Sequence, residues 1–268
     1  MQSFRIIYPP KELQPFVRYY WILRVTADGI VSQSTLPTGC VSLIFHRKER
    51  LFSSNLIDLQ PRSYICGQET VFSDVSSIGE TEMIVVVFQP HTSKLFFYHP
   101  ISLFRNLNIS IIEIEDKELI ELSNRIEDSM NNETCIKYIE SFLLNKIRVN
   151  PSYYLPRLSE VIKSINSTPN ISTKELAHIA CLSEKQFSRV FSDNIGLSPK
   201  EFSRIIRIQR ALYILQNSPR INFAQLAYDC CYTDQSHMRK EFKQFSGNTP
   251  KEFLSIYNPF SDYFSIYR

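Results

Sequence analysis

Glycine is scarce in this sequence, with six among 268 residues, and tryptophan occurs once. So little glycine leaves no material for the loops that cradle phosphates or dinucleotides, and no Gly-x-Ser-x-Gly nucleophile elbow occurs. No apolar run approaches the roughly eighteen uncharged residues of a membrane span, and residues 1–5 lack the basic-then-apolar build of a signal peptide. We therefore expect a cytoplasmic globular protein with no membrane association.

The residues that bind metals or catalyse reactions are dispersed. The six cysteines form no C-x-x-C pair, and adjacent Cys230 and Cys231 do not make a tetrahedral half-site, so we expect small buried thiols. His46, His91 and His99 form no His-x-His pair of the kind that a metal-dependent enzyme would need. We expect no metal, no cofactor and no enzymatic activity.

Charge is distributed unevenly. Residues 1–154 carry 15 basic and 17 acidic side chains, a net charge of −2, whereas residues 155–268 carry 15 and 10, a net charge of +5. The C-terminal excess is a weak indication of a polyanionic partner.

The N-terminal part reads as strands followed by helices. Runs of β-branched and aromatic residues bounded by turn residues predict strands at 16–25, 41–45 and 83–88. The pattern then changes to a helical period over 117–130 and 133–148, and Asn150-Pro151 and Pro156 place a linker at 149–156.

The predicted helix 133–148 has one apolar face, formed by Ile136, Ile139, Leu143 and Ile147. This face has two interpretations. It packs on the β-rich part, which is the default for an amphipathic helix, or it pairs with its twin in a homodimer.

The C-terminal part contains an internal repeat. One set of residues recurs fifty positions later, Ile171, Leu176 and Ala177 as Ile221, Leu226 and Ala227. After the next turn the offset is fifty-one, and Phe191, Gly196, Pro199, Lys200, Glu201 and Phe202 recur as Phe242, Gly247, Pro250, Lys251, Glu252 and Phe253. A single insertion at a turn, with register kept on both sides, indicates two copies of one unit.

Each copy predicts a helix-turn-helix. A short helix (173–180 and 223–230) precedes a turn and a second helix that ends before Gly196 or Gly247. Capping signals mark the starts, namely Ser172, Ser183, Ser198, Asn222 and Thr249. A connecting helix over 199–217 would span roughly 28 Å, near the ~34 Å between successive major-groove faces.

The outward faces of the two second helices carry residues suited to DNA. Basic side chains bond guanine or phosphate, Gln suits adenine, and Ser suits base or backbone. The candidate DNA-binding residues are Glu184, Lys185, Gln186, Ser188 and Arg189 on the first, and Gln235, Ser236, His237, Arg239, Lys240 and Lys243 on the second. Arg204, Arg207 and Arg210 of the connecting helix are interpreted as phosphate contacts or solubilising charge.

Residues 158–256 resemble the DNA-binding domain of the AraC/XylS transcription regulators. The resemblance rests on Glu175-Leu176-Ala177, Ser183-x-x-x-Phe187-x-Arg189-x-Phe191, Gly196-x-Ser198-Pro199, Asp234 to Lys243 and Gly247-x-Thr249-Pro250. It implies seven helices, two helix-turn-helix units and a linking helix. One departure is at Cys181 and Cys231, where the family usually has Gly in each turn, and a positive φ there would strain a cysteine. The other is Met238, which stands where an aromatic residue is usual and can fill the same core space.

The first 110 residues more weakly resemble the sensory domain of some family members, through Phe16 to Trp21, Leu36 to Phe45, Cys66-Gly67-Gln68 and Phe88-Gln89-Pro90. This implies a cupin-like β-barrel or sandwich with trailing helices, used for effector binding or dimerisation. Tyr20, Trp21 and Phe45 are candidates for an effector pocket, although aromatic residues in a small β-core are more often core.

The sequence therefore predicts an α+β multidomain protein. Its parts are a sensor or dimerisation domain at 1–150, β-rich to about 112 and helical at 117–148, an all-α DNA-binding domain at 156–258 and an aromatic tail at 259–268. We expect a transcription regulator, activator or repressor, whose partners are double-stranded DNA, RNA polymerase, a small-molecule effector and a second copy of the chain. The alternatives are a cupin-type enzyme or a protein-binding module that carries a helix-turn-helix tail.

Overall fold

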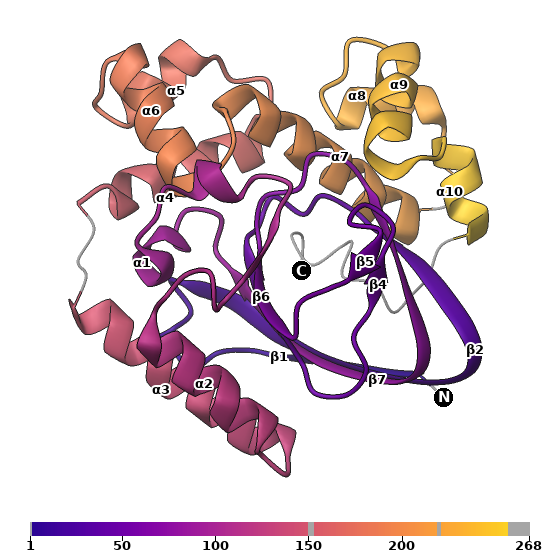
Figure 1. Ribbon diagram of the computed structural model, residues 1–268. Coiled ribbons are helices and arrows are strands. Elements are labelled where there is room, and N and C mark those ends of the chain that lie inside the picture. Colours follow the sequence, from indigo (N-terminus) through magenta and orange to yellow (C-terminus); the bar gives the residue numbers. More distant parts are fainter. Residues whose placement is uncertain (1, 150–152, 219–220, 257–268) are drawn as a thin grey trace.

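The structure, a computed structural model, describes residues 2–149, 153–218 and 221–256. The expected tail at 259–268 and residues 150–152 of the expected linker lie outside these ranges. Figure 1 shows a β-rich part with helices at one end, and above it a layer of helices from the C-terminal half. The α+β fold class is confirmed.

One antiparallel sheet forms the β-rich part, in the strand order β1-β2-β7-β3-β6-β8, with β4 and β5 at the side of β7. The strands are β1 (Gln2–Ile7), β2 (Val17–Thr35), β3 (Ser42–His46), β4 (Phe52–Ser53), β5 (Asp58–Leu59), β6 (Ser63–Cys66), β7 (Ser73–Phe88) and β8 (Asn108–Ser110). Strands β2 and β7 pair along their whole length, from Val17 opposite Phe88 to Thr35 opposite Ser73. The path ends at β1 and β8, so the sheet of the described residues is open, closer to a sandwich than to a closed barrel.

The trailing helices cover one face of this sheet. They are α1 (Lys94–Phe97), the 3₁₀ helix η1 (Ile101–Phe104), α2 (Lys117–Glu127) and α3 (Asn132–Val149). Because side chains alternate along a strand, Tyr20 and Ile22 of β2 and Phe45 of β3 point into the core beneath these helices. Tyr19 of β2 faces the opposite side, in a second apolar cluster.

The apolar face of α3 packs within its own chain. Ile139 and Leu143 are fully buried and Ile136 nearly so, while Ile147 is partly buried against the same core. The structure shows the interpretation in which this face packs on the chain's own β-rich part. The homodimer interpretation is corrected at these four positions, because their surface is already covered by the chain's own β-rich part.

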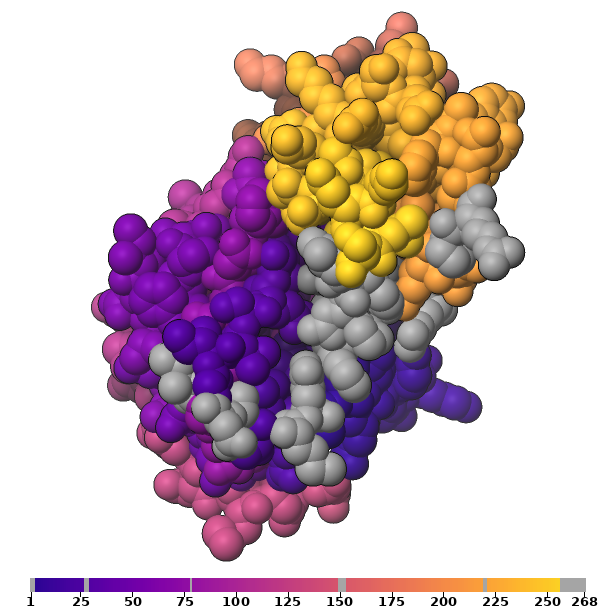
Figure 2. Space-filling view, turned by 90° about the vertical axis from the view of Figure 1, so that its right-hand side faces the viewer, coloured from indigo at the N-terminus to yellow at the C-terminus, as the bar shows by residue number. Residues whose placement is uncertain are grey.

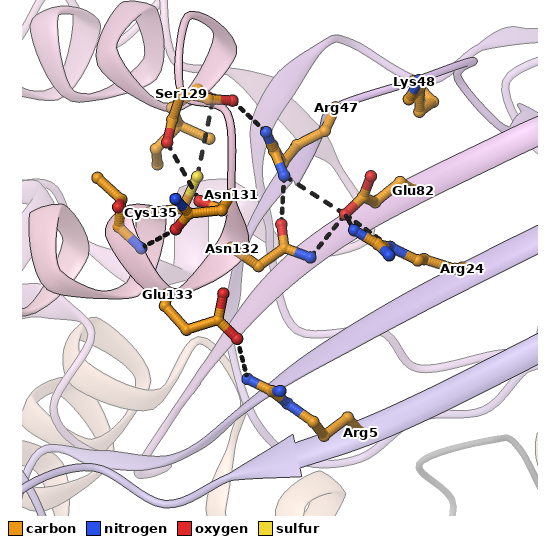
Figure 3. Close-up of polar contacts among 12 residues, drawn as sticks. Arg5, Arg24, Arg47, Lys48, Glu82, Ser129, Asn131, Asn132, Glu133 and Cys135 are labelled. Carbon is orange, nitrogen blue, oxygen red and sulfur yellow. Dashed lines mark hydrogen bonds and ion pairs between the residues drawn. The ribbon is translucent and has the colours of Figure 1, made fainter.

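A buried polar cluster joins the start of α3 to the sheet (Figure 3). Glu82 of β7 is 5% exposed and accepts hydrogen bonds from Asn132 Nδ2 at 2.6 Å and Arg24 Nε at 3.0 Å. Arg47 bridges Glu82, Asn132 and the Ser129 carbonyl. Burial raises the pKa of Glu82, but these hydrogen bonds and the two arginine charges outweigh it and hold that pKa below its usual value.

Seven helices make up the described C-terminal part: α4 (Leu155–Ser167), α5 (Thr173–Ile179), α6 (Glu184–Ile195), α7 (Pro199–Asn217), α8 (Phe223–Asp229), α9 (Gln235–Ser246) and α10 (Pro250–Ile256). The predicted pairs are confirmed as α5–α6 and α8–α9, and the predicted connecting helix as α7. Figure 1 shows the two pairs at opposite ends of α7, on the same side of the β-rich part.

Candidate nucleic-acid interface

Local capping fixes the first helix pair. The Ser172 side chain accepts from the Glu175 N–H, and the Glu175 carboxylate accepts from the Ser172 N–H at 3.0 Å, which closes a capping box at the start of α5. Ser183 caps α6, and Gly196 ends it at φ +90°. Ala177 is buried beside Leu176, and its small side chain lets α5 and α6 approach closely.

The second pair repeats this construction. Asn222 caps α8, Asp234 caps α9 by accepting from the His237 N–H at 2.8 Å, and Gly247 ends α9 at φ +73°. Cys181 and Cys231 occupy the two turns at φ +52° and +59°. Both turns have a positive φ, so each cysteine carries the strain of a left-handed conformation that glycine adopts freely.

Both second helices turn their apolar residues inward. On α6 these are Phe187, Val190 and Phe191, and on α9 they are Met238, Phe242 and Phe245, all at most 5% exposed. The opposite faces are exposed over Glu184, Lys185, Ser188 and Arg189 of α6, and over Gln235, Ser236, Arg239, Lys240 and Lys243 of α9. The structure thus brings the candidate residues together as two equivalent faces, one for each repeat.

Two candidates lie on the flanks of these faces and are partly exposed, namely Gln186 and His237. The His237 ring stands edge-on to Tyr232 with centroids 5.4 Å apart, and its Nε2 is 3.7 Å from Glu241 Oε1. His237 therefore packs against its own unit as well as bordering the face.

The arginines of α7 serve a different role from the one predicted. Arg204 Nε donates to Glu241 Oε1 at 2.6 Å, and Arg207 Nη2 lies 3.2 Å from Glu241 Oε2. Arg210 donates to the Asn166 carbonyl at 2.5 Å. The interpretation of these arginines as phosphate contacts or solubilising charge is wrong, because they hold α9 and the end of α4 against α7.

Glu241 was missed by sequence reasoning. It is 6% exposed on α9, and burial raises its pKa, but hydrogen bonds and charges from Arg204 and Arg207 outweigh burial and hold that pKa below its usual value. A signal existed in the sequence, since Glu241 lies four residues from Phe245 and three from Met238, on the buried side of α9.

A cavity of about 150 Å³ lies on the face of the sheet opposite the trailing helices. Trp21 lines it together with apolar residues of neighbouring strands, including Leu23, Ile44, Met83 and Val85. Tyr20 and Phe45 are absent from its lining and belong to the core on the other face. Of the three candidates for an effector pocket, Trp21 alone is placed at this cavity, and strand alternation would have separated it from Tyr20.

The described residues contain no group of three or more His, Cys, Asp and Glu side chains placed to hold a metal ion. None of their helices is long and apolar enough to cross a bilayer.

Repeated capped helix pairs, a connecting helix and two equivalent polar faces define a helix-turn-helix protein. Residues 176–255 match a family described as a helix-turn-helix domain, and residues 5–110 match a domain of unknown function, DUF6597.

Two known operon regulators match less than half of this chain. The Msm operon regulatory protein of Streptococcus mutans is 26% identical over 117 residues, 43% of this chain and 42% of that protein. The arabinose operon regulatory protein of Escherichia coli is 27% identical over 126 residues, 44% of this chain and 43% of that protein. The chain therefore spans less than half the length of these curated relatives.

Among solved structures, ToxT of Vibrio cholerae aligns over 96% of this chain and 99% of its own, with 14% identity and a TM-score of 0.46. The helix-turn-helix match over residues 176–255 and the two operon regulators support an AraC-type (AraC/XylS) helix-turn-helix regulator.

Proposed function

We propose that the protein is a sequence-specific DNA-binding transcription regulator that places α6 and α9 in successive major-groove segments. The observation that carries this proposal is the pair of equivalent exposed faces, each with basic and amide or hydroxyl side chains, at the two ends of one helix. The nineteen residues of α7 extend over roughly 28 Å, which suits adjacent major-groove faces about 34 Å apart.

The two faces differ in composition, and we expect them to contribute differently. Five basic side chains are available, Lys185 and Arg189 on α6 and Arg239, Lys240 and Lys243 on α9. Gln235, at the first position of α9, is suited to reading adenine. Domain bounds of 1–150 and 156–258, and contact with RNA polymerase, belong to the same proposal.

Substitutions on the two faces test it. Sites are first selected from a random-sequence duplex library with the full chain, and binding is then measured by fluorescence anisotropy. Arg189→Ala and Lys240→Ala should each weaken binding about tenfold, while Gln235→Ala should mainly relax the choice of base at one position. Lys200→Ala, an exposed lysine of α7 outside both faces, is the control. If the binding curves of all four variants coincide, the assignment of these two faces to DNA binding is wrong.

We also propose that the cavity of the β-rich part receives a small effector. A volume of about 150 Å³ is that of a cavity able to hold a benzene-sized ring. Of the described residues that line it, Glu69 alone carries a charge, and the amides of Gln33, Gln60 and Asn108 offer hydrogen bonds. An anion would be desolvated there without a cationic lining residue to offset the cost, so we expect an uncharged, largely apolar molecule.

The single tryptophan makes this testable, because Trp21 lines the cavity. Benzyl alcohol should change Trp21 fluorescence saturably, whereas benzoate, of similar size but charged, should not. Val85→Phe, which places a ring in the cavity, should abolish the response. Equal responses to both probes would refute the expected selectivity.

A further inference from the structure

The β-rich part contacts the same point of both helix-turn-helix units. Gly196, which ends α6, lies so close to it that an added Cβ would stand 2.9 Å from Ile101 Cγ2 and 3.0 Å from Gln68 Cγ. Gly247, the equivalent residue after α9, lies against the Phe72 ring, where a Cβ would stand 2.9 Å from Cζ. Figure 2 shows the second unit, in yellow, resting on the purple surface of the β-rich part.

The connecting helix is held between these two points. Gln209 of α7 is fully buried, and its Nε2 donates to the Pro37 carbonyl at 2.6 Å. Gly39 packs against Phe202 and Ile205, with a Cβ position 3.2 Å from the Phe202 ring. These contacts fix the middle of α7 against residues 37–39.

An ion pair holds the first turn of α7. Arg105 Nη2 lies 2.6 Å from Glu201 Oε1, while Glu201 Oε2 accepts hydrogen bonds from the N–H and hydroxyl of Ser198 in the capping box. Residues 36–39, 68–72 and 101–105 therefore form one continuous surface, which we call the clamp. It contacts the end of α6, the part of α7 from Glu201 to Gln209 and the end of α9.

The clamp is continuous with the wall of the cavity. Leu36, Thr38 and Cys40 line the cavity, whereas the intervening Pro37 and Gly39 contact α7. The fully buried Gln68 ties the segment down, since its Nε2 donates to the Gly39 carbonyl at 3.1 Å.

We propose that the clamp fixes the positions of α6 and α9 relative to each other, so that the β-rich part determines the base-pair spacing between the two halves of the DNA site. The two units meet through α7, through the hydrogen bond from Asn170 Nδ2 to the Cys231 carbonyl at 2.7 Å, and through the clamp, which contacts the ends of both α6 and α9. The proposal rests on the proposed DNA-binding function and assigns Phe72 and Arg105 as positioning residues for it.

Spacing is a sharp readout, because one inserted base pair moves the second half-site by about 3.4 Å and rotates it by about 34–36°. A rigid pair of recognition helices does not follow such a shift, whereas a pair released from the clamp adapts to it. We therefore expect the wild-type chain to lose about tenfold or more in affinity on insertion of one base pair.

The experiment uses the full chain and a selected duplex with zero, one or two base pairs inserted between its half-sites. Phe72→Ala and Arg105→Gln, the clamp variants, remove contacts with the end of α9 and with α7. Val71→Ala and Leu103→Ala change exposed side chains within the same two segments and are the matched controls. The clamp variants should bind all three duplexes within about threefold of one another, and the controls should keep the wild-type preference. Circular dichroism verifies that every variant keeps its helices.

The outcomes separate the two proposals. A wild-type chain that binds no duplex selectively overturns the DNA-binding function and the clamp with it. A spacing-sensitive wild type with clamp variants that are equally sensitive overturns the clamp alone and leaves the DNA-binding function standing.

Discussion

The buried carboxylate of Glu241 gives the most direct prediction about stability. Replacing it with Gln keeps the shape of the side chain but removes the charge that two arginines contact, at 2.6 Å from Arg204 Nε and 3.2 Å from Arg207 Nη2. Breaking a buried pair costs about 3–5 kcal/mol. Arg204 retains 27% exposure and Arg207 13%, so water offsets part of the loss, and we expect about 2–3 kcal/mol.

The assay is urea denaturation followed by circular dichroism at 222 nm. A loss of this size lowers the midpoint by about 1 M at an unchanged slope. Glu160→Gln, which breaks the exposed pair with Lys163, is the control and should change the free energy of unfolding by less than about 0.5 kcal/mol.

Acid provides a second check on Glu241. Its pKa lies below the usual value when the chain is folded, so the stabilisation is complete above the pKa of an unfolded glutamate, about 4.3, and is lost as the pH falls through the folded value. The difference between wild type and Glu241→Gln should therefore narrow below about pH 4. Equal midpoints for the two proteins at pH 7 would refute the anchoring role of Glu241.

Two further predictions concern strain and pH. Cys181→Gly should raise the free energy of unfolding by up to about 1 kcal/mol, because φ +52° suits glycine, and a lower thermal midpoint than wild type would contradict this. Burial lowers the pKa of His46 and His91 to about 4, with smaller contributions from Arg62 and Arg50 at His46 and from Lys163 at His91. Both pKa values lie below the unfolded value of about 6.5, so the free energy of unfolding should fall as the pH drops from about 6.5 to 4. His46→Gln should make this pH dependence less steep in urea titrations. An equally steep dependence in the variant would show that His46 is not responsible.

Local signals predicted the C-terminal helices closely. α7 begins at Pro199 and ends at Asn217, as the sequence indicates, because Ser198, Pro199 and Glu201 cap its start through contacts within one turn. The internal repeat predicted the same helix ends in the second unit, where Gly247 ends α9 as Gly196 ends α6. Capping and helical period depend on near neighbours, so one sequence is enough to predict them.

Contacts between distant residues were harder to predict. The distal halves of β2 and β7 lack an apolar alternation, and their pairing, such as Ser34 opposite Asp74, is made across the sheet. In an isolated α7, Arg204 and Arg207 would lie on the outward side. They are covered because α9 packs there and Glu241 contacts both arginines. The cavity likewise depends on which face of each strand meets the helices, which the sequence of one strand does not specify.

The dependence of DNA affinity on salt tests the central proposal most directly. The five basic side chains exposed on α6 and α9 would release counterions from the phosphates that they contact, so log K should fall linearly with log salt at a slope of up to about −4.5. The measurement uses the full chain with a selected duplex and a scrambled one, between about 50 and 300 mM potassium chloride, because the affinity of DNA-binding proteins changes steeply with salt in this region. We predict a steep slope for both duplexes and tighter binding to the selected one at every salt concentration. A slope near zero, or equal affinity for the two duplexes, would contradict sequence-specific DNA binding.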